Sequence, residues 1–191
     1  YNRALEIHEA AFGPNHPSVA RDLNNLAQLL RATGRPAEAE PLMRRALAID
    51  ELAFGPDHPS VARVLNNLAE LLRATGRLDK AEGNYVRALE IFEATYGPGH
   101  PDVAICLSNL AGLCQATNRL AEAEALMRRA LDIDESSFGP DHPAVAVGLD
   151  NLAGLLNATG RVDEAEANCL RALEIFEAAY GPNHSEVAVC L

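Results

Sequence analysis

The chain contains 191 residues with a formal net charge of −11, and 48% of its residues are hydrophobic. The surplus of acidic side chains argues against nucleic acid and anionic membranes as partners. Because no apolar run is long enough to cross a bilayer and no signal peptide is recognisable, we expect a cytoplasmic protein without a membrane partner.

One phrase returns at a fixed interval along the chain. It reads GPNHPSVA at Gly13, GPDHPSVA at Gly55, GPGHPDVA at Gly97, GPDHPAVA at Gly139 and GPNHSEVA at Gly181, always 42 residues apart. Such a period is typical of stacked supersecondary units that cannot bury their apolar faces alone. The phrase therefore predicts a single elongated array across residues 1–191.

Each period is expected to contain two helices and no strand. The chain opens with the later half of a second helix, YNRALEIHEAAFGP, and closes with the start of a first helix, VAVCL, so we expect a piece of a longer array. Between them, apolar residues recur at three- and four-residue steps in stretches such as 19–33 and 36–54, as in amphipathic helices. The predicted units are a partial repeat 1–16, the repeats 17–58, 59–100, 101–142 and 143–184, and a partial repeat 185–191.

The helix ends carry recognisable stop signals. Gly34, Gly76 and Gly160 can adopt the left-handed conformation that closes a helix, and Asn118 stands at the same place in the third repeat. In the junction phrase, Gly13 follows a helix end and Pro17 suits the first residue of the next helix.

The junction aromatics and histidines invite two interpretations. An aromatic residue precedes each junction glycine, and we expect it to wedge successive repeats together. The histidine of each junction could belong to a phosphate or metal site, but it has no His or Cys neighbour at ligand spacing. A structural imidazole bonded to the backbone is the favoured interpretation, and no metal is expected.

The cysteines form no CxxC motif. Cys106 and Cys114 lie about 12 Å apart along one predicted helix, too far for a disulfide. We expect these two, Cys169 and Cys190 to be reduced, as is usual in the cytoplasm.

The stretch LNNLAQLLRATGRPAEAEPLMRRAL carries a family resemblance. Its small and apolar residues fall in the order of a tetratricopeptide repeat: Leu26, Ala27, Leu30, Gly34, Ala39, Met43 and Ala46. The 42-residue period and the LNNLA, RALEI and GPDHPxVA phrases are similar to the kinesin-light-chain-like subclass, although the chain lacks Trp and the Pro that usually ends the second helix. The resemblance implies an all-α, right-handed α-solenoid of antiparallel helix pairs, whose first helices line a concave groove for peptides.

Two patterns separate the repeats. Second helices alternate between an LMRRAL type and a RALEIFEA type, which gives a true unit of 84 residues and places Phe92 and Phe176 where the other type has Asp50 and Asp134. The first helices do not alternate. The residues on one of their faces change once, between the repeats 59–100 and 101–142. If the family geometry holds, the groove residues are Arg21, Asn25, Gln28, Arg31, Arg63, Asn67, Glu70, Arg73, Asn109, Gly112, Asn151 and Gly154.

Three groups within this set have alternative interpretations. Asn25, Asn67, Asn109 and Asn151 form a ladder that either holds a peptide backbone or ties neighbouring helices together. The arginines either grip carboxylates or belong to a solvated helix face. Gly112 and Gly154 weaken a helix, which suggests that a ligand or neighbouring helix comes close there.

These features favour a non-enzymatic scaffold that binds an extended, acidic peptide or partner segment and needs no cofactor. The alternative is a structural or self-assembling array within a larger regulatory protein, including end-to-end association. An enzyme is not expected, because no nucleophile stands near a base in a recurring arrangement and the carboxylates sit in first turns and on helix faces.

Overall fold

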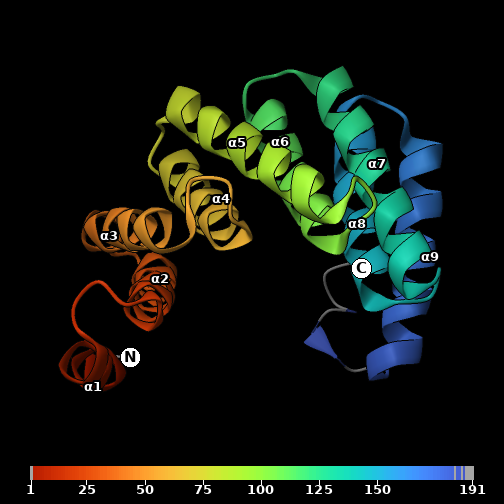
Figure 1. Cartoon of the computed structure of the whole chain (residues 1–191). Helices are drawn as coiled ribbons and strands as arrows, with labels where there is room; N and C mark the ends of the chain where they lie inside the picture. The colour runs from red at the N-terminus through yellow and green to blue at the C-terminus, as the bar shows by residue number, and fades with distance from the viewer. Residues whose placement is uncertain (1, 183, 186, 188–191) are drawn as a thin grey trace. The chain divides into compact units, whose positions relative to one another are not determined.

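The computed structural model describes residues 2–182, 184, 185 and 187, and every regular element in these residues is an α-helix (Figure 1). The chain divides into two compact units, Tyr1–Thr95 and Tyr96–Leu191. First helices are α2 (Pro17–Ala32), α4 (Pro59–Ala74), α6 (Pro101–Ala116) and α8 (Pro143–Ala158). Second helices are α1 (Asn2–Phe12), α3 (Pro36–Phe54), α5 (Leu78–Tyr96), α7 (Leu120–Phe138) and α9 (Val162–Tyr180).

Each first helix begins at a junction proline and is capped by the preceding histidine. The Nδ1 atom of His58 accepts a hydrogen bond from the backbone N–H of Ser60 at 3.1 Å, and His16, His100 and His142 cap their helices in the same way. The acceptor satisfies one of the N–H groups that a helix start leaves without a partner. The predicted structural role of the imidazole is therefore confirmed at these four junctions.

The junction aromatics make a contact that the sequence did not predict. The ring of Phe54 stacks on His58 of its own junction with centroids 4.4 Å apart, and the other junction aromatics do the same. These rings remain about half exposed. Stacking therefore holds the imidazole in its capping position, and the core contacts come from other residues.

The first helices end as the stop signals predict. Gly34 has a φ of 75° and Asn118 a φ of 60°, both in the left-handed region. Asn tolerates this conformation better than other residues with a side chain. The predicted helix ends are therefore confirmed, including the one without a glycine.

The core is a strip of apolar side chains within each unit. In the first unit Val19, Leu23 and Ala46 are fully buried with Val64 of the next first helix, and in the second unit Leu149 packs with Ala172 and Phe176. The frequent alanines let neighbouring helices approach closely. Cys106, Cys114 and Cys169 form no disulfide, and Cys190 lies outside the described residues.

An arginine on a second helix fixes the preceding junction. Arg87 of α5 donates to the Pro56 carbonyl at 3.1 Å and pairs with Glu51 of α3 at 2.9 Å. Arg45 binds Pro14 and Glu9 in the same way, and Arg171 binds Pro140 and Glu135. We call this arrangement the arginine clamp. The clamp explains why each of these junctions is followed, 31 residues later, by the arginine of an RAL motif in a second helix.

A second ion pair joins consecutive second helices. Arg77, just before α5, donates two hydrogen bonds of 2.8 and 2.7 Å to Glu40 of α3. Arg161 and Glu124 repeat this pairing in the second unit. Hydrogen bonds from Arg77 lower the pKa of Glu40 to about 2, so the ionised pair stabilises the folded state.

The cap predicts a specific response to substitution. His58→Ala should lower the free energy of unfolding by about 1 kcal/mol, because the Ser60 N–H loses its acceptor. His58→Asn should be less destabilising, because Asn is a good capping residue. Urea unfolding of both variants checks this, and equal losses would show that stacking on Phe54 matters more than the cap.

The Glu40 pair predicts a dependence on pH. A carboxyl whose pKa is lowered by folding stabilises the protein above its unfolded pKa, and this contribution disappears as the pH falls through the folded pKa. Glu40→Gln should therefore be less stable than the parent chain by about 1 kcal/mol at pH 7, allowing for solvent screening. The difference should shrink between about pH 4.5 and pH 2. Urea unfolding across this range measures it, and a constant difference would contradict the assignment.

Candidate peptide-binding site

Two hollows lie at equivalent places in the two units. One, of about 250 Å³, is lined by α2, α3 and α4, and the other, of about 440 Å³, is lined by α6, α7 and α8. We call them the α2–α4 pocket and the α6–α8 pocket. The residues that line them correspond at a spacing of 84 residues, for example Arg21 with Ile105 and Asp50 with Asp134. The two pockets are therefore copies of one site.

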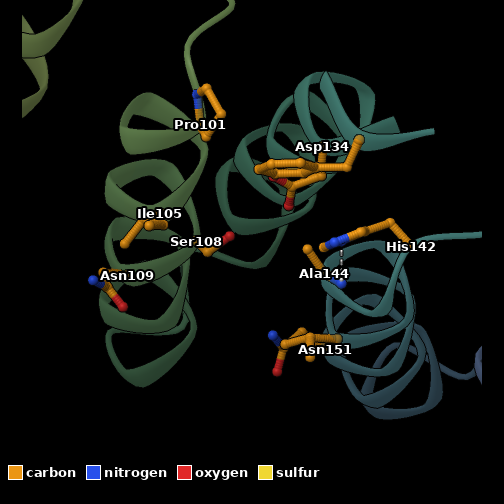
Figure 2. Close-up of a pocket in the computed structure, with 11 residues that line it drawn as sticks. Pro101, Ile105, Ser108, Asn109, Asp134, His142, Ala144 and Asn151 are labelled. Atoms are coloured by element: carbon orange, nitrogen blue, oxygen red, sulfur yellow. Dashed lines mark hydrogen bonds between the residues drawn. The ribbon is translucent and has the colours of Figure 1, made fainter. Parts of the chain in front are cut away.

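The α6–α8 pocket has apolar walls with a carboxylate between them. Ile105 of α6 and Val147 of α8 line it from two first helices, and both are about half exposed. Figure 2 shows Asp134 of α7 between the residues of α6 and those of α8, with Ser108 directed toward the same space. A ligand here would meet mostly hydrocarbon and one acidic group.

The α2–α4 pocket is polar. Arg21 of α2 and Arg63 of α4 replace the two apolar wall residues of the other copy and are exposed, while Asn25 and Gln28 are half-buried. Asp50 of α3 is only 4% exposed. Two guanidinium groups thus stand at the opening of this pocket.

The carboxyls of Asp50 and Asp134 have different surroundings. Burial raises the pKa of Asp50, and the nearby charges of Arg63 and His58 oppose the rise. Burial also raises the pKa of Asp134, where His142 is the opposing group. Val147 stands at the position equivalent to Arg63, so Asp134 has one cation fewer beside it than Asp50.

The structure distributes the predicted groove residues over several environments. Arg21, Asn25, Gln28 and Arg63 come together in the α2–α4 pocket, and Asn109 and Asn151 line the α6–α8 pocket. The remaining predicted residues lie outside both pockets: Arg31, Asn67, Glu70, Arg73, Gly112 and Gly154.

Arg31 and Arg73 share an acidic partner within the chain. Glu70 of α4 lies 2.9 Å from Arg31 of α2 and 3.9 Å from Arg73. Glu70 therefore neutralises part of the positive charge of Arg31 and Arg73, which the sequence analysis expected to bind carboxylates of a ligand. Arg21 and Arg63 are therefore the stronger candidates for binding an acidic group.

The asparagine ladder forms a tie at one step. Asn67 of α4 donates to the side-chain oxygen of Asn24 on α2 at 3.1 Å. At this position the asparagine ties two neighbouring helices together, which is the second of the two interpretations of the ladder. Asn25 faces the α2–α4 pocket instead.

One of the two explanations for Gly112 and Gly154, the close approach of a neighbouring helix, is wrong. A Cβ atom at Gly112 or Gly154 would meet nothing within 4 Å, so no neighbouring helix requires a glycine there. Gly148 is the position of close approach, because a Cβ there would lie 3.2 Å from Leu131 Cδ1. This contact belongs to the core of the second unit and was not predicted.

Asp50 and Asp134 were not predicted as site residues. The signal was present, because a polar residue recurs at an 84-residue spacing where the other type of second helix has Phe92 and Phe176, both of which are buried. An acidic residue at a core position of an amphipathic helix is unusual enough to mark a site.

The described residues contain neither a cluster of metal ligands nor a membrane-spanning helix. Among these residues no group of three or more His, Cys, Asp or Glu side chains could hold a metal ion. No helix in the same residues is long and apolar enough to cross a membrane.

Comparisons with known proteins identify the repeat. The family model described as tetratricopeptide repeat matches residues 1–52, 23–92, 60–136 and 145–191. The crystal structure of BtubC (BKLC) from P. vanneervenii is 28% identical, with a TM-score of 0.80 over 95% of this chain and 72% of that one. A search of the curated proteins gave no match.

Two crystal structures of nearly identical TPR-like repeats from a Podosopora anserina kinesin light chain are also similar in fold. One is 23% identical, with a TM-score of 0.74 over 93% of this chain and 84% of that one. The other is 23% identical, with a TM-score of 0.71 over 94% and 85%. The chain belongs to the tetratricopeptide repeat family, as an α-solenoid array of the kinesin-light-chain-like type.

Proposed function

We propose that the chain binds an extended segment of a partner protein at its first helices, with the α2–α4 pocket and the α6–α8 pocket each able to receive a side chain of such a segment. Tetratricopeptide repeats generally mediate interactions between proteins and are generally non-catalytic. The observation that carries the proposal is the recurrence of one pocket at an 84-residue spacing with altered wall residues. A purely structural array would need no such divergence.

The α2–α4 pocket favours an acidic group. Arg21 and Arg63 stand at its opening and are exposed, and no ion pair among the described residues occupies the Arg21 guanidinium. A guanidinium presents donors in a planar fork that matches a carboxylate. The acidic preference proposed here therefore depends on these two residues rather than on Arg31 and Arg73.

The α6–α8 pocket offers the larger apolar surface. Ile105 and Val147 would contact an aliphatic side chain, and burying such a group is worth about 25 cal/mol per Å². The net charge of −11 disfavours nucleic acid, so the proposed partner is a protein. We also propose the cytoplasm as the location, in keeping with Cys106, Cys114 and Cys169, which form no disulfide.

A paired substitution tests the α2–α4 pocket. Peptides are first selected from a random library on the parent chain, and their affinities are measured by fluorescence anisotropy. Changing Arg21 and Arg63 together to Gln should weaken acidic peptides by about tenfold or more. Gln removes the charge without adding repulsion beside Asp50.

The matched control for that pair is Lys80→Gln, on an exposed part of α5 outside both pockets. It should leave the affinity unchanged. Raising the salt concentration should weaken acidic peptides but not neutral ones, because screening shortens the reach of the arginine charges. Equal salt tolerance of both peptide kinds would contradict the acidic preference.

A single substitution tests the α6–α8 pocket. Ile105→Ala should weaken the selected peptides by about tenfold, because it removes apolar wall surface that the bound side chain would cover. Leu170→Ala on α9 is the control, since Leu170 is 54% exposed and Ile105 is 55% exposed. If both variants bind as the parent does, or if no peptide is enriched at all, self-assembly becomes the favoured function.

A further inference from the structure

The α6–α8 pocket combines two features that rarely occur together. Its walls are apolar side chains from α6 and α8, yet the half-buried carboxyl of Asp134 stands between them (Figure 2). Desolvating a carboxylate is costly unless hydrogen bonds or an opposite charge compensate for it. The pocket therefore contains a charge with incomplete compensation.

The first unit shows how the same carboxyl is compensated in the other copy. Asp50 lies beside Arg63, whose charge opposes the effect of burial. At the position of Arg63 the second unit has Val147, and at the position of Arg21 it has Ile105. Both cationic residues have been replaced by hydrocarbon while the aspartate has been retained.

The remaining polar atoms of the pocket suit a cation. Ser108 and Asn151 line the same pocket, and His142, whose Nδ1 accepts from the Ala144 N–H at 3.2 Å, is the group whose charge opposes the effect of burial at Asp134. No ion pair or hydrogen bond to the Asp134 carboxylate occurs among the described residues. An acidic ligand would be repelled here, and an apolar one would desolvate the carboxylate further.

We propose that the α6–α8 pocket receives a lysine or arginine side chain of the partner segment, with its hydrocarbon stem against Ile105 and Val147 and its charged end at Asp134. The inference rests on the proposed function and names the partner chemistry at one of its two pockets. Long basic side chains commonly bury their stems on apolar surface while the charged end finds a polar partner. The partner thus supplies a permanent cation where the first unit has Arg63 and the second has Val147.

Small probes test this inference without a selected peptide. N-acetyl-lysine-N-methylamide and N-acetyl-norleucine-N-methylamide have similar stems and differ in the terminal ammonium. Each is titrated into the whole chain while the methyl NMR signals of Ile105 and Val147 are followed. The lysine probe should bind about tenfold more tightly than norleucine, because it adds a charge-assisted hydrogen bond to Asp134.

Two variants identify the carboxyl as the cause. Asp134→Asn should remove the preference for lysine over norleucine, because the pocket keeps its shape but loses its charge. Val147→Arg, which restores the residue found at Arg63, should abolish lysine binding by supplying the cation internally. Asp50→Asn in the first unit is the matched control and should change neither probe.

The outcomes separate this inference from the proposed function. Absence of a saturable shift with lysine, equal binding of the two probes, or a lysine preference that survives Asp134→Asn would overturn the inference. If selected peptides still depend on Ile105 in that case, the proposed function stands and only the basic side chain is wrong. If the probe results hold while no peptide is enriched, the pocket binds a basic group but the extended-segment function fails.

Discussion

The arginine clamp is the interaction on which three of the described junctions depend, those at Pro14, Pro56 and Pro140. A helix pair in a repeat array cannot bury its apolar face by itself, so the angle at which the next pair arrives must be fixed. Arg87 fixes it by binding the Pro56 carbonyl and Glu51 at once. The proline lacks an N–H and holds its backbone stiffly, so the carbonyl is presented in a constant direction. The core strip and the pockets both depend on this fixed angle between neighbouring helix pairs.

The two pockets show how a constant framework permits local divergence. Several lining residues occupy equivalent places in both units, and the helices that carry them begin and end at equivalent residues. The walls differ, because Ile105 and Val147 stand where the other pocket has arginines, but the helices do not. An aspartate lines both pockets, buried as Asp50 and half-buried as Asp134, and the residues around it differ.

The sequence was sufficient to predict local structure and insufficient to predict pairing between distant side chains. The fold, the helix ends and the histidine caps follow from signals within a few residues, including Asn118 at a left-handed position. The neutralisation of Arg31 by Glu70 joins residues 39 apart, and the clamp of Arg45 reaches 36 residues back to Glu9. Such contacts depend on how repeats stack. Asp134 was missed although its recurrence with Asp50 is visible in the sequence, because only the packing of α6, α7 and α8 shows that it lines a pocket.

The regular spacing of the clamp bears on how such arrays change in length. Each of the three described clamps joins an arginine to a proline carbonyl 31 residues earlier. A duplication or deletion of whole repeats would therefore create a new junction that already has its arginine, proline and histidine in register. Genetic recombination can therefore lengthen or shorten the array without further substitutions at the junctions. Selection is then free to act on the few wall residues that make one copy differ from the next.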